Sequence, residues 1–190
     1  MKKSVRYSLF FLSAMALAMA GCGDGNKSKN TDSDSDSLDV IEAVADSSVY
    51  GVVGDGTAMH SLQLVTDVGD TLDFVLADVD SDIPVVLGGL LAGDRVAVVA
   101  HDDNGEHVAD RVINITSLLG KWTSIDKSFE IREGGIVESN IKAETNPWTS
   151  WKLSNTNIVL NKDTFQIDVL GPDSLCLENE NGIFAYKRQQ

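Results

Sequence analysis

The sequence predicts an all-β protein built from two small antiparallel barrels, one of five strands and one of eight. Apolar and polar residues alternate over short segments, as over 164–170, which is typical of strands with one buried face. Turn-forming pairs such as Asn104-Gly105 and Asn181-Gly182 separate these segments at short intervals. Closing such strands into barrels removes sheet edges that would otherwise be exposed.

The chain begins with a segment typical of a secretory signal. Lys2, Lys3 and Arg6 precede an apolar run over 9–20. This run is too short for a membrane-spanning helix and has the basic start and small final residues of a signal peptide. We therefore expect residues 1–21 to be removed.

The signal ends in a motif that resembles a bacterial lipobox, the tetrapeptide Met-Ala-Gly-Cys that finishes at Cys22. The resemblance implies acylation of Cys22 and anchorage in a bacterial cell envelope, with the outer membrane as the expected location. Several acyl chains anchor a protein stably, whereas a single chain binds only marginally. The alternative is an ordinary cleaved signal with an incidental cysteine.

Composition excludes some partners. The chain has 15 Lys and Arg against 29 Asp and Glu, a formal net charge of −14. This charge repels phosphate backbones, and no basic stripe offsets it, so we expect no nucleic-acid partner. Anionic lipid should not attract the body of the protein either, which leaves the N-terminal lipid as the expected membrane contact.

Residues 22–37 are predicted to form an acylated, flexible tether, because small polar residues cannot bury enough apolar surface to fold. Ser37 lies in an Asp-Ser-Leu tripeptide that resembles the O-glycan acceptor of some Gram-negative anaerobes, which makes Ser37 a candidate glycosylation site. Residues 38–46 are expected to form a short helix with Ser37 as its cap.

The first barrel is predicted over 38–115. Its strand order, with a long third connection and a Gly-Asp-Arg-Val entry to the fourth strand, resembles an OB-type barrel. OB barrels that bind nucleic acid carry exposed aromatic and basic residues on strands two and three, which this chain lacks there. The resemblance therefore implies a shape without that function. The expected strands are 49–54, 59–66, 71–76, 95–101 and 107–115.

The second barrel is predicted over 116–190 as an eight-stranded meander. Gly120-Lys121-Trp122 at its start and Arg188 at its end resemble the lipocalin signature. The resemblance implies that Trp122 lies at the closed end of the barrel, beneath Arg188. The segment is half as long as a full lipocalin, so we expect a largely filled interior with a shallow mouth. The expected strands are 120–125, 128–132, 137–143, 149–153, 157–160, 164–170, 174–178 and 183–188.

The chain contains none of the common catalytic or phosphate-binding motifs, so we expect no enzyme and no cofactor. His101 and His107 flank one hairpin turn, but no further spacing completes a metal site, and we expect two exposed histidines instead of a metal pair. Trp148 and Trp151 lie three residues apart at the start of the strand expected over 149–153, and on one strand they would face opposite sides. Trp148 is a candidate ligand contact at the barrel rim, and Trp151 is expected in the core.

These observations favour a lipid-anchored, non-catalytic binding or interaction module that docks another envelope protein. The alternative is a carrier of a small hydrophobic or glycan ligand in the second barrel. A carrier needs an apolar cavity with a few polar groups, whereas a filled barrel favours the interaction module.

Overall fold

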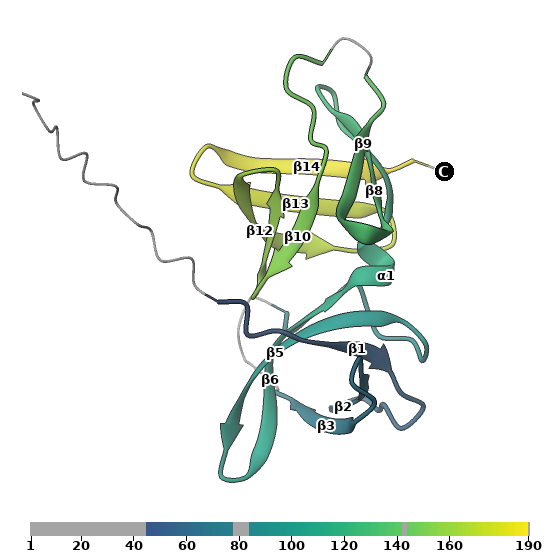
Figure 1. Ribbon diagram of the computed structural model, residues 1–190, viewed down its shortest axis with the longest axis vertical. Helices are drawn as coiled ribbons and strands as arrows, with labels where there is room; N and C mark the ends of the chain where they lie inside the picture. The colour runs from purple at the N-terminus through teal and green to yellow at the C-terminus, as the bar shows by residue number, and fades with distance from the viewer. Residues whose placement is uncertain (1–44, 78–83, 142–143, 190) are drawn as a thin grey trace, which may run out of the picture. The chain divides into compact units, whose positions relative to one another are not determined.

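The computed structural model describes residues 45–77, 84–141 and 144–189. These segments form two sheets with one helical turn between them, which confirms the predicted all-β class (Figure 1). Cys22, Ser37 and most of the helix expected over 38–46 lie outside the described residues.

The first sheet closes into a five-stranded barrel, as predicted. Its strand order is β3-β2-β1-β5-β6-β4, and a parallel pairing of β3 with β6 joins the ends of the five long strands. The two-residue β4 was not predicted; it pairs with β6 through Val86 and Val112. The strands are β1 (Val49–Val53), β2 (Ser61–Thr66), β3 (Thr71–Leu76), β4 (Val86–Leu87), β5 (Arg95–Asp103) and β6 (Glu106–Asn114).

The β5–β6 hairpin forms at the predicted turn. Asn104 has a φ of 51° and Gly105 a φ of 91°. These left-handed values suit the tight turn that matches the twist of paired strands, and Asn and Gly adopt them at low cost.

Between the sheets lies a helical turn, α1 (Ile115–Leu118), where no helix was predicted. Asn114 is fully buried and caps this turn, because its Oδ1 accepts a hydrogen bond from the Ser117 N–H at 2.9 Å. Its Nδ2 donates to the Gly89 carbonyl at 2.8 Å and to Asp94 Oδ2 at 2.7 Å. Asn114 therefore ties the end of β6 and the start of α1 to the loop between β4 and β5.

The second sheet is an eight-stranded antiparallel meander that nearly closes into a barrel. Its order is β10-β11-β12-β13-β14-β7-β8-β9, so the last strand pairs with the first. The free edges meet at a single bridge between Ile136 and Ser150. The strands are β7 (Gly120–Thr123), β8 (Ser128–Arg132), β9 (Ile136–Ser139), β10 (Trp151–Ser154), β11 (Asn157–Leu160), β12 (Asp163–Leu170), β13 (Ser174–Asn179) and β14 (Gly182–Arg188), with a 3₁₀ turn η1 (Glu133–Gly135).

Several strands are shorter than expected. β10 begins at Trp151 and not at Thr149, since the N–H groups of Thr149 and Ser150 donate to the Asn161 side chain at 2.8 and 3.1 Å. β7 ends at Thr123 because the next residues form a turn. These differences matter for the placement of the tryptophans and for the edge of β14.

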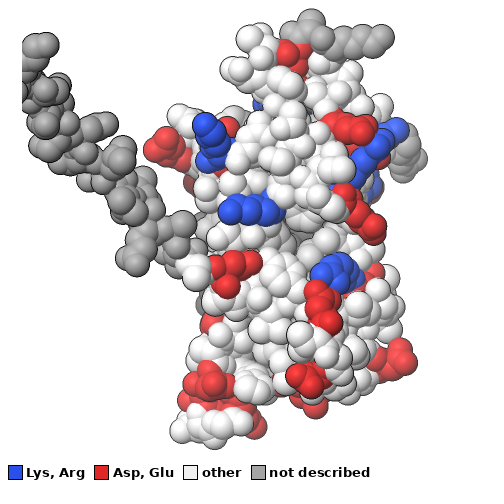
Figure 2. Space-filling view, viewed as in Figure 1, with Lys and Arg blue, Asp and Glu red and all other residues white. Residues whose placement is uncertain are grey.

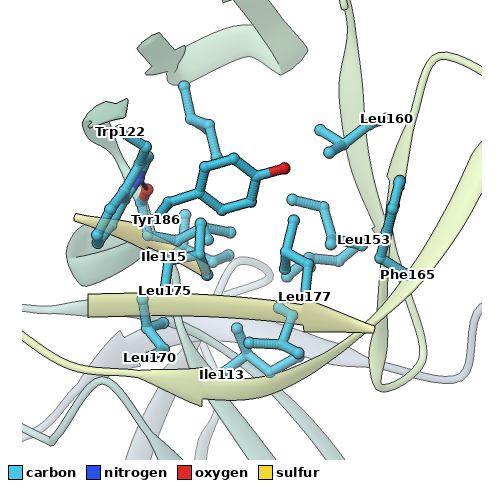
Figure 3. Close-up of a cluster of buried hydrophobic side chains, with 14 of the residues drawn as sticks. Ile113, Ile115, Trp122, Leu153, Leu160, Phe165, Leu170, Leu175, Leu177 and Tyr186 are labelled. Atoms are coloured by element: carbon cyan, nitrogen blue, oxygen red, sulfur yellow. Dashed lines mark hydrogen bonds between the residues drawn. The ribbon is translucent and has the colours of Figure 1, made fainter. Parts of the chain in front are cut away.

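Alternation along β5 sends its side chains into two cores. Val96 and Val98 are fully buried inside the first barrel. Ala97, between them, belongs to the second cluster together with Leu87 and Ile113, which pack against side chains of the second barrel. Figure 3 shows Ile113 and Ile115 among residues of β12, β13 and β14. The domain boundary predicted between residues 115 and 116 falls at α1, although β5 and β6 contribute side chains to both cores.

Candidate functional site

The three signature residues of the second barrel come together in the structure. Trp122 is fully buried, and its Nε1 donates to the Leu118 carbonyl at 2.9 Å. The guanidinium carbon of Arg188 lies 4.1 Å from the centroid of the indole ring. Gly120 has a φ of 125°, and a Cβ at this position would lie 2.6 Å from Arg188 Nη1. Gly120 thus provides the room that the guanidinium occupies.

Arg188 also closes this end of the barrel by hydrogen bonds. Its guanidinium donates to the carbonyls of Ser117, Leu119 and Pro172, with a distance of 2.8 Å to Leu119. Burial lowers the pKa of Arg188, yet a guanidinium remains charged in proteins. The contacts all run to backbone and indole, so this arrangement holds the fold together.

The structure reverses the expected positions of Trp148 and Trp151. Trp148 is 7% exposed and packs edge-to-face on Phe129, Phe165 and Tyr186, with centroid distances of 5.0, 5.7 and 6.4 Å. Trp151 is half-buried, and its Nε1 donates to the Arg132 carbonyl at 2.7 Å. Trp148 precedes β10, so strand alternation does not set its direction. Trp148 is a core residue and not a rim contact.

A charged pair covers Trp148. Lys127 Nζ lies 4.0 Å from the centroid of the indole ring and forms an ion pair with Glu144, which also accepts a hydrogen bond from Ser139 Oγ. Burial opposes the charge on Glu144, but the bonds from Lys127 and Ser139 outweigh it and lower the pKa of Glu144. Sequence reasoning missed this pair because its members lie 17 residues apart.

Tyr186 packs against Trp148 and is within the electrostatic influence of Glu144. Burial, together with the negative charge of Glu144, raises the pKa of Tyr186 to about 12. Its ring packs edge-to-face on Phe129 at 5.0 Å, and Phe165 packs on Phe184 at 5.9 Å. Five aromatic side chains therefore fill the part of the barrel around Trp148: Phe129, Trp148, Phe165, Phe184 and Tyr186. Figure 3 shows Tyr186 among the aliphatic side chains of the core.

An open groove runs beside the last strand. It has a volume of about 620 Å³ and is lined by residues 123–127 on one side and 183–187 on the other. Ile125 is fully exposed and Ile183 is 67% exposed. We call this surface the β14 groove.

A second open surface, of about 610 Å³, lies between the two barrels and includes the half-buried rings of Tyr50 and Trp151. Arg95 on its wall is bonded by both guanidinium branches to Asp67 at 2.9 and 2.6 Å. The Tyr50 hydroxyl donates to Asp46 at 2.7 Å. Burial and the charge of Asp46 raise the pKa of Tyr50 to about 12. The polar ends of Tyr50 and Arg95 in this cleft are thus bonded to neighbouring aspartates.

Asp46 connects the start of the first sheet to the second. It accepts hydrogen bonds from the Tyr50 hydroxyl, the Ser48 N–H and the Asn155 N–H, the last at 2.8 Å. Burial acts against the charged form, but these hydrogen bonds outweigh it and lower the pKa of Asp46 to about 2. Asn155 lies 109 residues from Asp46, beyond the reach of local sequence patterns.

The two hairpin histidines are each paired with an aspartate. His101 Nδ1 lies 2.8 Å from Asp110 Oδ1, and His107 Nδ1 lies 2.5 Å from Asp102 Oδ1. All four side chains are about half exposed or more. Within the described segments, no group of three or more His, Cys, Asp or Glu side chains could hold a metal ion.

In the parts of the chain that the structure describes, no helix has the length and apolar character needed to cross a bilayer. Comparisons of this chain with protein-family models, with curated proteins and with solved structures found no match.

Proposed function

We propose that this protein is a non-catalytic binding module that docks another protein of a bacterial envelope and is held to the membrane by lipid on Cys22. The observation that supports docking is the contrast between a filled interior and open surfaces. Aromatic side chains occupy the inside of the second barrel, whereas the β14 groove is open and lined by exposed Ile125 and Ile183.

The filled interior favours docking over carriage of a ligand. An eight-stranded barrel either fills with side chains or holds one small ligand. Ligand pockets of carriers surround most of the ligand surface. Trp148, the expected rim contact, is packed under Lys127 and offers no open ring face to a sugar. Docking is therefore better supported than carriage of a glycan or apolar ligand.

The finer family resemblances remain part of this proposal. The stack of Arg188 on Trp122 supports a lipocalin-like second barrel. The pairing of β3 with β6 supports an OB-like first barrel. Acidic side chains gather at the free end of the β5–β6 hairpin, where Asp102, Asp103 and Glu106 are exposed (Figure 2). Such a surface disfavours nucleic acid as a partner.

The test is photo-crosslinking in the cells that make the protein. A benzophenone side chain replaces Ile183 in the β14 groove, and a matched chain carries it at Val169, an exposed aliphatic position on β12. We expect one discrete protein adduct from position 183 and none from 169. If native mass spectrometry of the detergent-extracted protein instead shows a stoichiometric bound lipid or glycan, and no protein adduct forms, the carrier is favoured.

The anchor is tested separately by feeding the cells an alkyne-labelled fatty acid. The wild-type chain and the Cys176→Ala variant should both incorporate the label, whereas Cys22→Ala should not. Cys176 is the matched control because it is the chain's other cysteine, half-buried on β13. Label retained in Cys22→Ala would disprove acylation at Cys22.

A further inference from the structure

We propose that the edge of β14 facing the β14 groove binds an extended peptide segment of a partner protein as an added strand. This inference rests on the proposed docking function and names the surface and the chemistry of the partner. In this binding mode, main-chain hydrogen bonds supply affinity and alternate side chains supply specificity.

The register shows which backbone groups are free. β14 pairs with β13 from Gly182 to Lys187, and the Arg188 N–H donates to the Asp173 carbonyl at 3.0 Å. In an antiparallel pair, alternate residues bond to the partner strand. The even-numbered residues of β14 therefore bond to β13, and the odd-numbered ones point their N–H and C=O groups the other way.

On that other edge only the end of β14 is covered. Lys187 pairs with Thr123, and the Gln189 N–H donates to the Lys121 carbonyl at 2.9 Å. The next pair in this register would join Ala185 to Ile125, but β7 stops at Thr123. The N–H and C=O groups of Ile183 and Ala185 thus face the groove with no strand partner among the described residues.

The β7–β8 turn explains why the groove is open. The Ser124 N–H donates to the Lys127 carbonyl at 2.7 Å, and the Lys127 N–H donates to Ser124 Oγ at 3.1 Å. These bonds turn the chain away from β14 and leave Ile125 fully exposed. The turn forms the far wall of the groove, at a distance from β14 that its own backbone does not bridge.

The side chains at this edge suit an apolar strand. Natural sheets protect exposed edges with charges, proline or bulges. Ile183 and Ala185 provide none of these on the outer face, and the β13–β14 register is unbroken. Phe184 and Tyr186 point to the barrel interior, where Phe184 packs on Phe165. An added strand would lay small or β-branched residues over Ile183 and Ala185.

The charges around the β14 edge indicate which kind of partner binds there and in which direction its strand runs. Two copies of this chain, each with a formal net charge of −14, repel one another, which disfavours pairing of β14 with itself. Exposed Glu178 lies opposite Ile183 on β13, and exposed Lys187 lies at the other end of the edge. An antiparallel peptide with an acidic start and a basic end places each charge beside its opposite.

The experiment uses the full-length chain in detergent micelles and the acetylated, amidated hexapeptide ETVTVK. Amide hydrogen exchange is followed by NMR with and without the peptide. We expect exchange at Ile183 and Ala185 to slow at least tenfold, whereas Phe184 and Tyr186, already bonded to β13, should change little. Exchange rates that saturating peptide leaves unchanged at all four amides would overturn the proposal.

Matched probes and variants test each part of the contact. A peptide N-methylated at alternate residues should lose binding, and the charge-reversed peptide KTVTVE should bind several-fold more weakly. Ala185→Pro removes an N–H that faces the groove and should weaken ETVTVK binding at least tenfold. If Ala185→Pro does not fold, the affinity of Ile183→Lys for ETVTVK is measured instead. Val169→Lys, at another exposed aliphatic residue, is the control. Unchanged affinity in Ile183→Lys would count against the edge.

Failure of this inference differs from failure of the docking function. A discrete partner cross-linked from a benzophenone at Ile125, on the far wall of the groove, whose capture is unaffected by Ile183→Lys would preserve docking and exclude the β14 edge. Absence of any partner, together with protection of Ile183 and Ala185 by the peptide, would preserve the edge site and exclude docking in the envelope.

Discussion

Replacing Trp122 with alanine tests the central packing arrangement of the second barrel. Trp122 is fully buried, donates a hydrogen bond to the Leu118 carbonyl and lies under the Arg188 guanidinium. Three contributions are lost together in Trp122→Ala: ring burial, the indole hydrogen bond and the cation–π contact. The substitution also leaves Arg188 over a void.

The magnitude follows from these contributions. Truncating a buried aromatic side chain to alanine costs about 3–5 kcal/mol. The cation–π contact adds about 0.5–2 kcal/mol, and an unpaired Leu118 carbonyl adds about 1–3 kcal/mol. Because such terms overlap, we expect a combined loss of about 4–7 kcal/mol in the free energy of unfolding. Small proteins have only about 5–15 kcal/mol in total, so the variant should be close to unfolding at 25 °C.

The assay is urea denaturation followed by circular dichroism, with Trp151→Ala as the matched control. Trp151 is also a tryptophan with a bonded Nε1, but it is half-buried. We expect its substitution to cost about 1–2 kcal/mol, mainly from the lost hydrogen bond and partial burial. Trp122→Phe keeps an apolar ring and should fall between the two. Equal losses in Trp122→Ala and Trp151→Ala would refute the assigned role of Trp122.

Three further predictions follow from the geometry. Gly120→Ala should destabilise the fold by about 2–3 kcal/mol, more than Gly182→Ala does. Both glycines have φ above 120°, but only at Gly120 would the added Cβ lie 2.6 Å from a guanidinium nitrogen. Equal shifts in melting temperature for the two variants would contradict this. Glu144→Gln should lower the pKa of Tyr186 while burial keeps it above 10, as measured by phenolate absorbance during base titration. The folded-state pKa of Asp46 is about 2 against an ordinary 3.8, so the stability that its charge provides is present above pH 3.8 and is lost as the pH falls toward 2. Asp46→Asn should therefore flatten the dependence of stability on pH in this range. An unchanged pH profile of stability in the variant would exclude the effect.

Local patterns predicted the strands well, because turns and alternation act over a few residues. Asn104 and Gly105 form the expected hairpin with left-handed φ values. The eight segments of the second half all contain strands, and the last pairs with the first. The contact of Trp122 with Arg188 was reached through a family resemblance and not through spacing, since the two residues are far apart in the chain.

The misplaced elements have a common physical cause. Trp148 was assigned to the rim by counting along a strand, but β10 begins only at Trp151 because Asn161 takes the preceding N–H groups. The direction of a side chain in a loop depends on what packs around it. In this case Phe129 and Phe165, from other strands, provide the surrounding surface.

The sequence by itself determined the strand segments, the turns and the acidic charge, and it led us to expect a lipid anchor at Cys22. These properties depend on neighbouring residues or on composition. Only the tertiary structure decided which aromatic side chains fill the barrel interior, that Lys127 and Glu144 cover Trp148, and that β7 ends before it covers β14. Each of these outcomes depends on where distant segments meet, and that is set by the packing of the whole core rather than by any local pattern.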